Sequence, residues 1–164
     1  MQNIDQEFIG FFSRLLRSIG LDDLSSKIVA ILYIEDREIS MEEIAKMTGY
    51  SLASISNKMK LLETLVMIQR IKRPGTKRAF FYMEKDIIKL NIMRISAVKE
   101  NFINPIKLNF PGFIEKYKKN ASYNREARKK LTIIENYHKQ VIQLEKVLDK
   151  FKRELEKISI NDRI

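Results

Sequence analysis

The C-terminal part of the chain carries a run of apolar residues whose spacing alternates strictly between three and four. Its members are Ile134, Tyr137, Val141, Leu144, Leu148, Phe151, Leu155 and Ile158. Such steps keep side chains on one face of an α-helix, and a run of nearly four heptads is the pattern of a coiled-coil seam. A long helix with this stripe needs a cover, from its own chain or from a second one. We favour pairing between two chains, because the rest of the sequence is short relative to the stripe.

Two shorter amphipathic helices are predicted before residue 35. The first places Phe8, Phe12 and Leu15 on one face and ends near Gly20. The second follows the carboxylates of residues 22–23, which favour the positive end of a helix dipole. If the chain pairs through its end helices, the three apolar residues of the first helix join the seam in the interface.

The middle of the chain contains two capped helices and a hairpin. Ser40 and Glu43 have the spacing of a capping box, and Ser51 is placed to cap a further helix, in which Leu52, Ile55, Met59, Leu62 and Val66 fall on one face. Residues 68–72 and 79–83 are rich in Ile, Phe and Tyr, and a basic segment with a Pro-Gly turn separates them. They predict a β-hairpin with a basic tip.

The charge is distributed unevenly along the chain. Residues 1–50 have a net charge of −4 and residues 51–83 a net charge of +6, within a total of +10. A basic excess favours a polyanionic partner through a salt-dependent field. The alternative is a surface that only keeps the protein in solution.

The order helix, helix, capped short helix, Ser-capped helix and basic hairpin is that of a winged helix-turn-helix. A helix fits the major groove of DNA, and a basic hairpin can lie along the adjoining backbone. Asn57 is assigned to a base, because Asn can bond adenine through two hydrogen bonds, and Lys58 to a phosphate or guanine. The candidate contacts of the recognition helix are Ser51, Ala53, Ser54, Asn57 and Lys58. Those of the wing are Arg73, Gly75, Thr76, Lys77 and Arg78.

The same residues resemble a known family. The segments Ser40 to Ala45, Thr48 to Glu63 and Pro74 to Tyr82 look like the MarR superfamily of transcriptional regulators, and most of all like its GbsR-type branch. The similarity is strongest over residues 20–85. Two departures are evident. Many relatives have a glycine after the recognition helix where this chain has residues 65–67, Leu-Val-Met, and an Asp-x-Arg wing where it has residues 75–78, Gly-Thr-Lys-Arg.

The resemblance implies a mainly α fold with a small β-hairpin wing, in which the winged helix-turn-helix is flanked by dimerisation helices. We expect an N-terminal dimerisation helix in residues 1–20, a DNA-binding domain in residues 21–84 and a helical dimerisation region in residues 85–164. The implied function is that of a cytoplasmic homodimeric regulator, a repressor, on a pseudo-palindromic operator of double-stranded DNA. Two-fold symmetry then sets the half-sites about 34 Å apart.

A cluster of aromatic residues lies between the hairpin and the seam, in a segment that Pro105, Pro111 and Gly112 interrupt. Some GbsR-type proteins respond to choline or related osmolytes, and aromatic faces hold ammonium groups. The resemblance thus implies an effector pocket, and the alternative is ordinary core packing of the aromatic residues. The candidate residues of the pocket are Phe102, Phe110, Phe113 and Tyr117.

Several classes of protein are disfavoured. With no Cys and one His, the chain offers no thiolate nucleophile and no Cys- or His-rich metal site, and no nucleophile–base pair or phosphate-binding glycine loop suggests an enzyme or a cofactor. Its longest apolar run, residues 28–34, is far below the ~20 residues of a membrane span. Two alternatives stay open: an interaction protein built from a winged helix and a coiled coil, and a non-specific nucleoid-type DNA binder. A basic cluster over residues 116–130 suits each of these.

Overall fold

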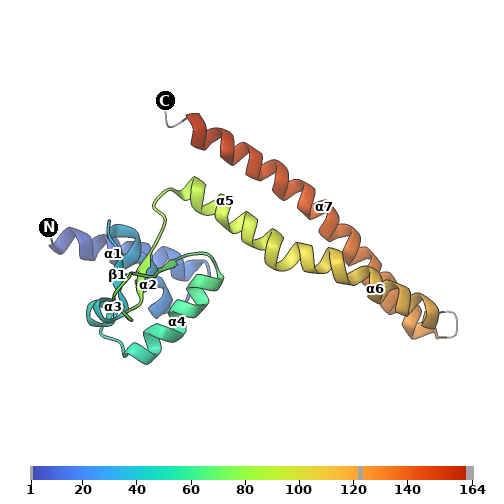
Figure 1. The fold of residues 1–164 in the computed structure, drawn as a ribbon, viewed down its shortest axis with the longest axis horizontal. Coiled ribbons are helices and arrows are strands. Elements are labelled where there is room, and N and C mark those ends of the chain that lie inside the picture. The colour runs from blue at the N-terminus through green and yellow to red at the C-terminus, as the bar shows by residue number, and fades with distance from the viewer. Residues whose placement is uncertain (1, 122–123, 162–164) are drawn as a thin grey trace. The chain divides into compact units, whose positions relative to one another are not determined.

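The computed structural model describes residues 2–121 and 124–161 (Figure 1). Met1, residues 122–123 and residues 162–164, which include the outermost positions of the two predicted terminal segments, lie outside the described residues. The chain divides into two compact units, Met1–Leu90 and Asn91–Ile164. Among the described helices, none has a stretch both long and apolar enough to cross a bilayer.

The first unit contains four helices, three short strands and the beginning of a fifth helix. Its elements are α1 (Gln2–Ser18), α2 (Asp23–Ile34), β1 (Ile39–Ser40), α3 (Met41–Thr48), α4 (Leu52–Thr64), β2 (Gln69–Ile71), β3 (Phe80–Tyr82) and α5 (Ile87–Val98). This order is the predicted winged helix-turn-helix, and the expectation of a mainly α fold with a small β wing is confirmed.

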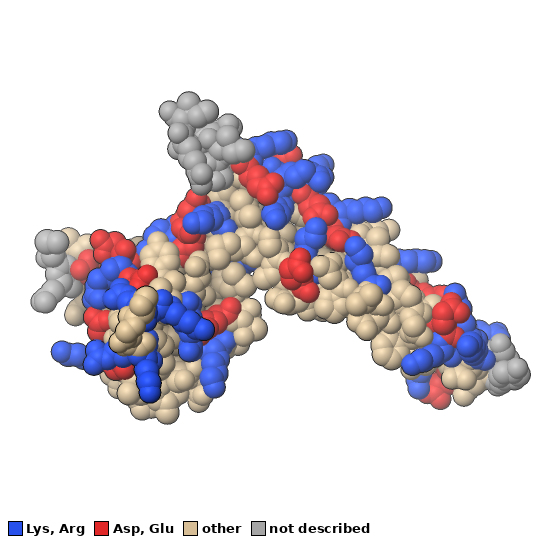
Figure 2. Space-filling view, viewed as in Figure 1, with Lys and Arg blue, Asp and Glu red and all other residues tan. Residues whose placement is uncertain are grey.

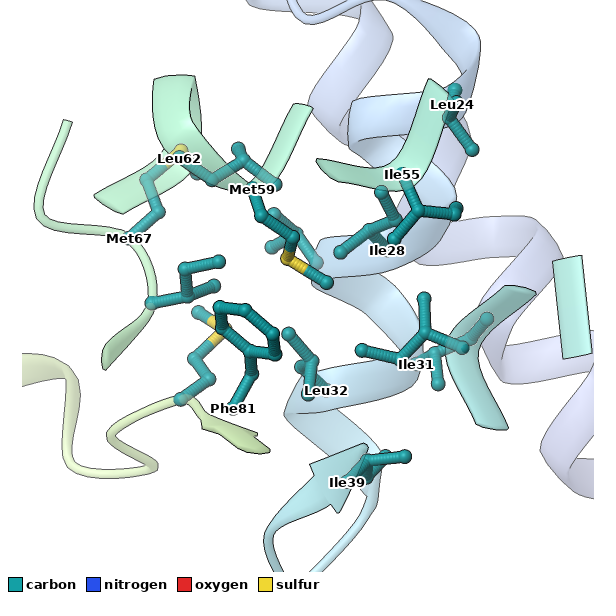
Figure 3. Packing of buried hydrophobic residues seen from close by; sticks show 14 of the residues in the cluster. Leu24, Ile28, Ile31, Leu32, Ile39, Ile55, Met59, Leu62, Met67 and Phe81 are labelled. Carbon is teal, nitrogen blue, oxygen red and sulfur yellow. The ribbon is translucent and has the colours of Figure 1, made fainter. Parts of the chain in front are cut away.

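Helix α2 forms the centre of the first unit. Its side chains from Ile28 to Leu32 are almost completely buried, and α1, α3, α4 and the sheet supply the residues around them (Figure 3). Ile55, Met59 and Leu62 of α4 and Phe81 of β3 point into this cluster. Three of the five residues predicted on one face of α4 are therefore buried, whereas Leu52 is exposed and Val66 lies beyond the end of the helix.

The sheet has one strand more than the predicted hairpin. Strands β2 and β3 pair antiparallel with Arg70 opposite Phe81, and β1 adds to the other side of β3 with Ile39 opposite Phe81. The strand order is β1-β3-β2. With only two residues, β1 is too short to show a strand pattern in the sequence.

Both predicted helix caps are present. In α3 the Glu43 amide donates to the Ser40 hydroxyl at 3.2 Å, and the Glu43 carboxylate accepts from the Ser40 amide at 2.9 Å, which completes the capping box. In α4 the Ser54 amide donates to the Ser51 hydroxyl at 3.2 Å. These bonds satisfy amides that the first helical turn leaves without partners.

Helix α4 ends in a Schellman motif whose left-handed residue is not a glycine. The Met67 amide donates to the Leu62 carbonyl and the Val66 amide to the Glu63 carbonyl, both at 3.0 Å, while Val66 has a φ of 53°. Helix α1 ends with the same bond pattern, but there the left-handed residue is Gly20. A β-branched residue in this region is strained, so Val66 takes a conformation that favours glycine.

The second unit is an antiparallel helical hairpin. The last part of α5 continues through a π-helical turn, η1 (Lys99–Ile103), into α6 (Asn104–Ala121), and α7 (Arg125–Asn161) returns along α6. Ile103 and Ile106 form a buried cluster with Val141, against which Phe110 and Leu148 pack. An ion pair of Lys107 with Glu145 at 2.6 Å also joins the two helices.

The prolines of residues 101–123 do not break the helix there. The π-helical turn ends next to Pro105 and widens the helix where the proline ring would otherwise meet a preceding carbonyl. Pro111 lies inside α6 at an exposed position. The inner face of α6 has helical spacing through Ile106, Phe110 and Ile114, which packing against α7 stabilises.

Replacing Val66 by glycine is expected to stabilise the protein. Relief of the left-handed valine outweighs the greater freedom of glycine in the unfolded chain, so the free energy of unfolding should rise by about 1 kcal/mol. The measurement is the urea midpoint of Val66→Gly against the unsubstituted protein.

Two variants control for lost side-chain contacts. Val66→Ala keeps a Cβ at the left-handed position and should give no gain. Gly20→Ala introduces the same strain at the end of α1, where φ is 101°, and should destabilise. A midpoint for Val66→Gly at or below that of Val66→Ala would show that Val66 is not strained.

Candidate nucleic-acid interface

Helix α4 presents a mixed polar surface on the side away from α2. Ala53 and Asn57, two of the predicted DNA contacts, are exposed and lie one turn apart. Further along the same side the exposed residues are Lys60, Leu61 and Thr64. The width and chemistry of this surface suit the major groove, which admits an α-helix with short polar side chains near its N-terminus.

The two serines predicted as contacts are engaged with each other. The Ser51 and Ser54 hydroxyls lie 3.0 Å apart, and Ser51 also accepts from the Ser54 amide. Ser51 is exposed and Ser54 half-buried. Their first role is to shape the N-terminal turn of α4, where unpaired amides and the helix dipole favour an anion such as a phosphate.

Lys58 lies on the flank of α4 next to the start of α2. Its ammonium forms an ion pair with Asp22 at 3.1 Å, and the side chain is 34% exposed. Asp22 is also the N-cap of α2 and accepts from the Ser25 amide at 3.1 Å and the Ser25 hydroxyl at 2.7 Å. The charge predicted to reach DNA is thus shared with an acid of the chain itself.

The Asp22 carboxylate is held in its charged form. Burial acts to raise its pKa, but the hydrogen bonds from Ser25 and from Lys58, together with the Lys58 charge, lower the pKa from 3.8 to about 2. Asp22 therefore stays negative at any pH at which DNA binding is measured. It keeps Lys58 oriented along α4 and reduces the positive field there.

The wing turn has the geometry predicted for it. Gly75 has a φ of 76°, a conformation that favours glycine, and the Arg78 amide donates to the Thr76 hydroxyl at 3.1 Å. These features turn the chain between β2 and β3. The basic residues that follow are thereby held at the exposed end of the wing.

The cations of the wing fall into two groups. Arg73 donates to Glu38 at 2.7 Å and lies over the Phe80 ring at 4.1 Å, so it braces the wing against the segment before β1. Lys77 and Arg78 are exposed, and among the described residues no acid lies within ion-pair distance of them. Lys and Arg side chains project from the surface of the first unit, with Asp and Glu side chains among them (Figure 2).

Two basic residues were missing from the predicted interface. Lys60 is exposed on the same side of α4 as Asn57, and Lys72 is exposed just after β2; neither has an acidic partner within ion-pair distance among the described residues. The sequence contained the signal for Lys60, because it lies three residues after Asn57 and shares its helix face. Lys72 precedes Arg73 in the predicted basic segment.

The predicted interface residues of α1 divide between core and surface. Phe8 and Phe12 are half-buried and pack against Tyr33 of α2, with ring centroids 6.0 and 5.0 Å away. Leu15 is exposed, and with Ile4 and Phe11 it forms a second apolar stripe on α1 that the sequence analysis did not single out. Within the described residues of the first unit, nothing covers this stripe.

The seam of α7 divides in the same way. One alternate set of positions is turned toward the chain itself: Ile134 and Leu148 are half-buried, and Val141 and Leu155 are buried. The other set, spaced by seven residues, is exposed and consists of Tyr137, Leu144, Phe151 and Ile158. Ile133 and Val147, also exposed, widen this second half, which we call the free stripe of α7.

The predicted effector residues do not all share one environment. Phe110 packs in the α6–α7 core, 5.7 Å from the Tyr137 ring and 6.2 Å from the His138 ring, and Tyr117 is half-buried. Phe102 and Phe113 are exposed.

A cavity of about 850 Å³ lies elsewhere, in the first unit between α1, α2 and α3. The described residues include no group of three or more His, Asp or Glu side chains placed to hold a metal ion.

The fold is shared with a known regulator. A structure titled "Crystal Structure of a transcriptional regulator" superimposes with a TM-score of 0.62 at 17% identity, over 93% of this chain and 98% of that one. S. aureus MepR in a DNA-binding conformation aligns with a TM-score of 0.41, also at 17% identity, over 87% and 94% of the two chains. The chain matches no protein-family model and no curated protein sequence.

The Asp22 carboxylate is expected to contribute stability that depends on pH. Its pKa is lower in the folded chain than the ordinary 3.8, so the contribution is complete above about pH 4 and disappears as the pH falls toward 2. Because the side chain is 43% exposed, the effect should be below about 1 kcal/mol. The measurement is the difference in urea midpoint between the unsubstituted protein and Asp22→Asn from pH 7 to pH 2.

Asparagine still caps a helix, so this substitution removes the charge and spares the cap. Asp36→Asn serves as the control, because the Asp36 carboxylate is exposed and forms no hydrogen bond or ion pair with the described residues. The control shows how much of the difference comes from removing an exposed carboxylate of the same kind. If the difference in urea midpoint between Asp22→Asn and the unsubstituted protein does not shrink in acid, the lowered pKa of Asp22 is contradicted.

Proposed function

We propose that this protein is a sequence-specific DNA-binding transcriptional regulator that acts as a homodimeric repressor on a pseudo-palindromic operator. The observation that carries the proposal is the capped helix α4, whose exposed face bears Asn57, together with a wing that ends in Lys77 and Arg78, cations with no acidic partner among the described residues. The fold shared with a transcriptional regulator supports it.

The two parts of this surface have different tasks in the proposal. Asn57 is exposed on α4 and offers a donor and an acceptor, which together match the edge of adenine. Lys77, Arg78 and Lys60 supply charge for phosphates, which sets affinity and register without reading sequence. Lys58 acts with Asp22 as a brace that orients α4.

Two unpartnered apolar stripes support the dimer. The stripe of α1 and the free stripe of α7 expose large side chains that a monomer in water leaves uncovered. Both belong to the helices that flank the DNA-binding residues in sequence. A symmetric pair formed through them brings two copies of α4 to a two-fold operator.

An osmolyte effector is the remaining element of the proposal. The exposed rings of Phe102 and Phe113 offer aromatic faces to an ammonium group. Choline or glycine betaine at millimolar concentration is then expected to weaken operator binding. Unchanged affinity in the same titration removes the effector from the proposal.

Removing the amide of Asn57 is expected to reduce specificity. Anisotropy titrations should compare duplex DNA from upstream of the protein's own gene with an unrelated duplex, and the regulator should prefer the first by about 10³-fold or more. Asn57→Ala should weaken operator binding by about 1–3 kcal/mol and leave binding to the unrelated duplex almost unchanged.

The matched control is Asn136→Ala, which makes the same change at an exposed position of α7. Lys77→Gln and Arg78→Gln give the complementary result, a nearly uniform loss on both duplexes with a salt slope smaller by about 1 for each. Equal binding of both duplexes by the unsubstituted protein would favour a nucleoid-type role. No binding at low salt would favour a protein-interaction role.

The free stripe of α7 is expected to hold the dimer together. Replacing Leu144 and Phe151 by glutamate places two charges in an apolar interface, where an unpaired charge is costly, and should convert the dimer to a monomer. Sedimentation equilibrium measures the change. The control carries glutamate at Thr132 and Gln143, which are exposed polar positions of the same helix, and should remain dimeric.

A further inference from the structure

The end of the helical hairpin carries a concentration of positive charge that the proposed function does not use. We define the hairpin tip as residues 115–130, which cover the end of α6 and the start of α7. It contains seven Lys and Arg and two Glu, a net charge of +5. Lys and Arg gather there in the space-filling view (Figure 2).

Both acids of the hairpin tip are occupied by neighbouring lysines. Glu115 pairs with Lys118 at 3.3 Å, and Glu126 pairs with Lys130 at 2.9 Å. The other cations are exposed, and no acid among the described residues lies within ion-pair distance of them. They are Lys116, Lys119, Arg125, Arg128 and Lys129.

The distribution of charge in the rest of the hairpin is different. Lys99 pairs with Asp149, Lys107 pairs with Glu145, and Lys157 pairs with Glu154, so acids offset much of the positive charge along these helices. The hairpin tip departs from this balance. Moreover, Arg125, Arg128 and Lys129 lie in the first turns of α7, where the helix dipole favours acids, so their charge is unfavourable for the isolated helix. A surface that served only solubility would not need cations at this end.

The chemistry of the hairpin tip points to a nucleic-acid backbone. A peripheral membrane surface combines cations with apolar side chains that enter the bilayer. Within residues 115–130, no large apolar side chain of the described part is exposed; the nearest ones are Phe113, over which the Lys116 ammonium lies at 5.7 Å, and Ile133. Unpaired cations without an apolar anchor suit a dense row of phosphates.

We propose that the hairpin tip is a second, sequence-independent surface for duplex DNA, separate from α4 and the wing. This proposal rests on the proposed function and deepens it. The hairpin tip adds contacts to the DNA backbone, whereas the residues proposed to recognise bases lie on α4 in the first unit. Its cations hold phosphates and read no bases, so its contribution is equal on every duplex and decreases steeply with salt.

The test neutralises four cations of the hairpin tip together. The variant carries glutamine at Lys119, Arg125, Arg128 and Lys129, since glutamine keeps the helix propensity and removes the charge. The matched control carries glutamine at Lys139, Lys146, Lys150 and Arg153, which are exposed cations further along α7. Both variants lose four charges, and circular dichroism checks that both keep their helix content.

The probe is a random-sequence duplex of about 40 base pairs without the operator, titrated at several salt concentrations. For the tip variant, the slope of log affinity against log salt should fall by about 3, and affinity near 0.1 M salt should fall tenfold or more. The control variant should change the slope by less than about 1. The ratio of operator affinity to random-duplex affinity should be the same in the tip variant and the unsubstituted protein.

Four outcomes overturn the proposal. An equal loss in both variants would show that net charge alone is responsible. An unchanged slope in the tip variant would show that the tip does not contact DNA, as would absence of duplex binding by the unsubstituted protein at low salt. Loss of binding to phosphatidylserine vesicles with duplex binding intact would assign the tip to a membrane. Failure of Asn57→Ala to alter specificity would refute the proposed function and leave the result for the tip intact.

Discussion

The first unit depends on the burial of the middle of α2. Five consecutive side chains of this helix, from Ile28 to Leu32, are buried, so the surrounding elements must cover its middle on every face, whereas Lys27 near its start remains partly exposed. Each large side chain buried in this way contributes about 1.5–3 kcal/mol. The inner faces of α1, α4 and β3 are committed to this cover. What α4 shows to solvent is therefore fixed by what α2 requires of it.

Local signals in the sequence were sufficient for the winged helix-turn-helix. The capping box of Ser40 and Glu43, the Ser51 cap and the turn at Gly75 each act within a few residues, and the structure confirms all three. The environment of Lys58 depends instead on Asp22, which is distant in sequence and reaches Lys58 only after α2 and α4 pack. Arg73 and Glu38 are another such pair. Contacts of this kind have no periodic or local signature.

The structure of the second unit is less evident from the sequence than that of the first, for two physical reasons. The aromatic residues of α6 lie on different faces of the helix and show no helical period by themselves. The period is evident only when Ile106, Phe110 and Ile114 are taken together. In α7 the positions that pack on the chain itself and those left exposed both recur every seven residues. A heptad pattern shows that a stripe is apolar but not which half of it the chain covers. The interface residues therefore stay a prediction.

The π-helical turn determines where the helical hairpin can accommodate a change in the number of residues. In η1 the Asn104 amide donates to the Lys99 carbonyl, one residue further back than in an α-helix, so the segment accommodates an additional residue without a break. Each residue of an α-helix turns the chain by about 100°. In a π-helical turn the additional residue is taken up without changing the faces that follow, so loss of one residue between 99 and 103 would give an ordinary α-helical turn and leave Ile106 facing Val141. The same loss inside α6 would instead rotate every later side chain of that helix by about 100°.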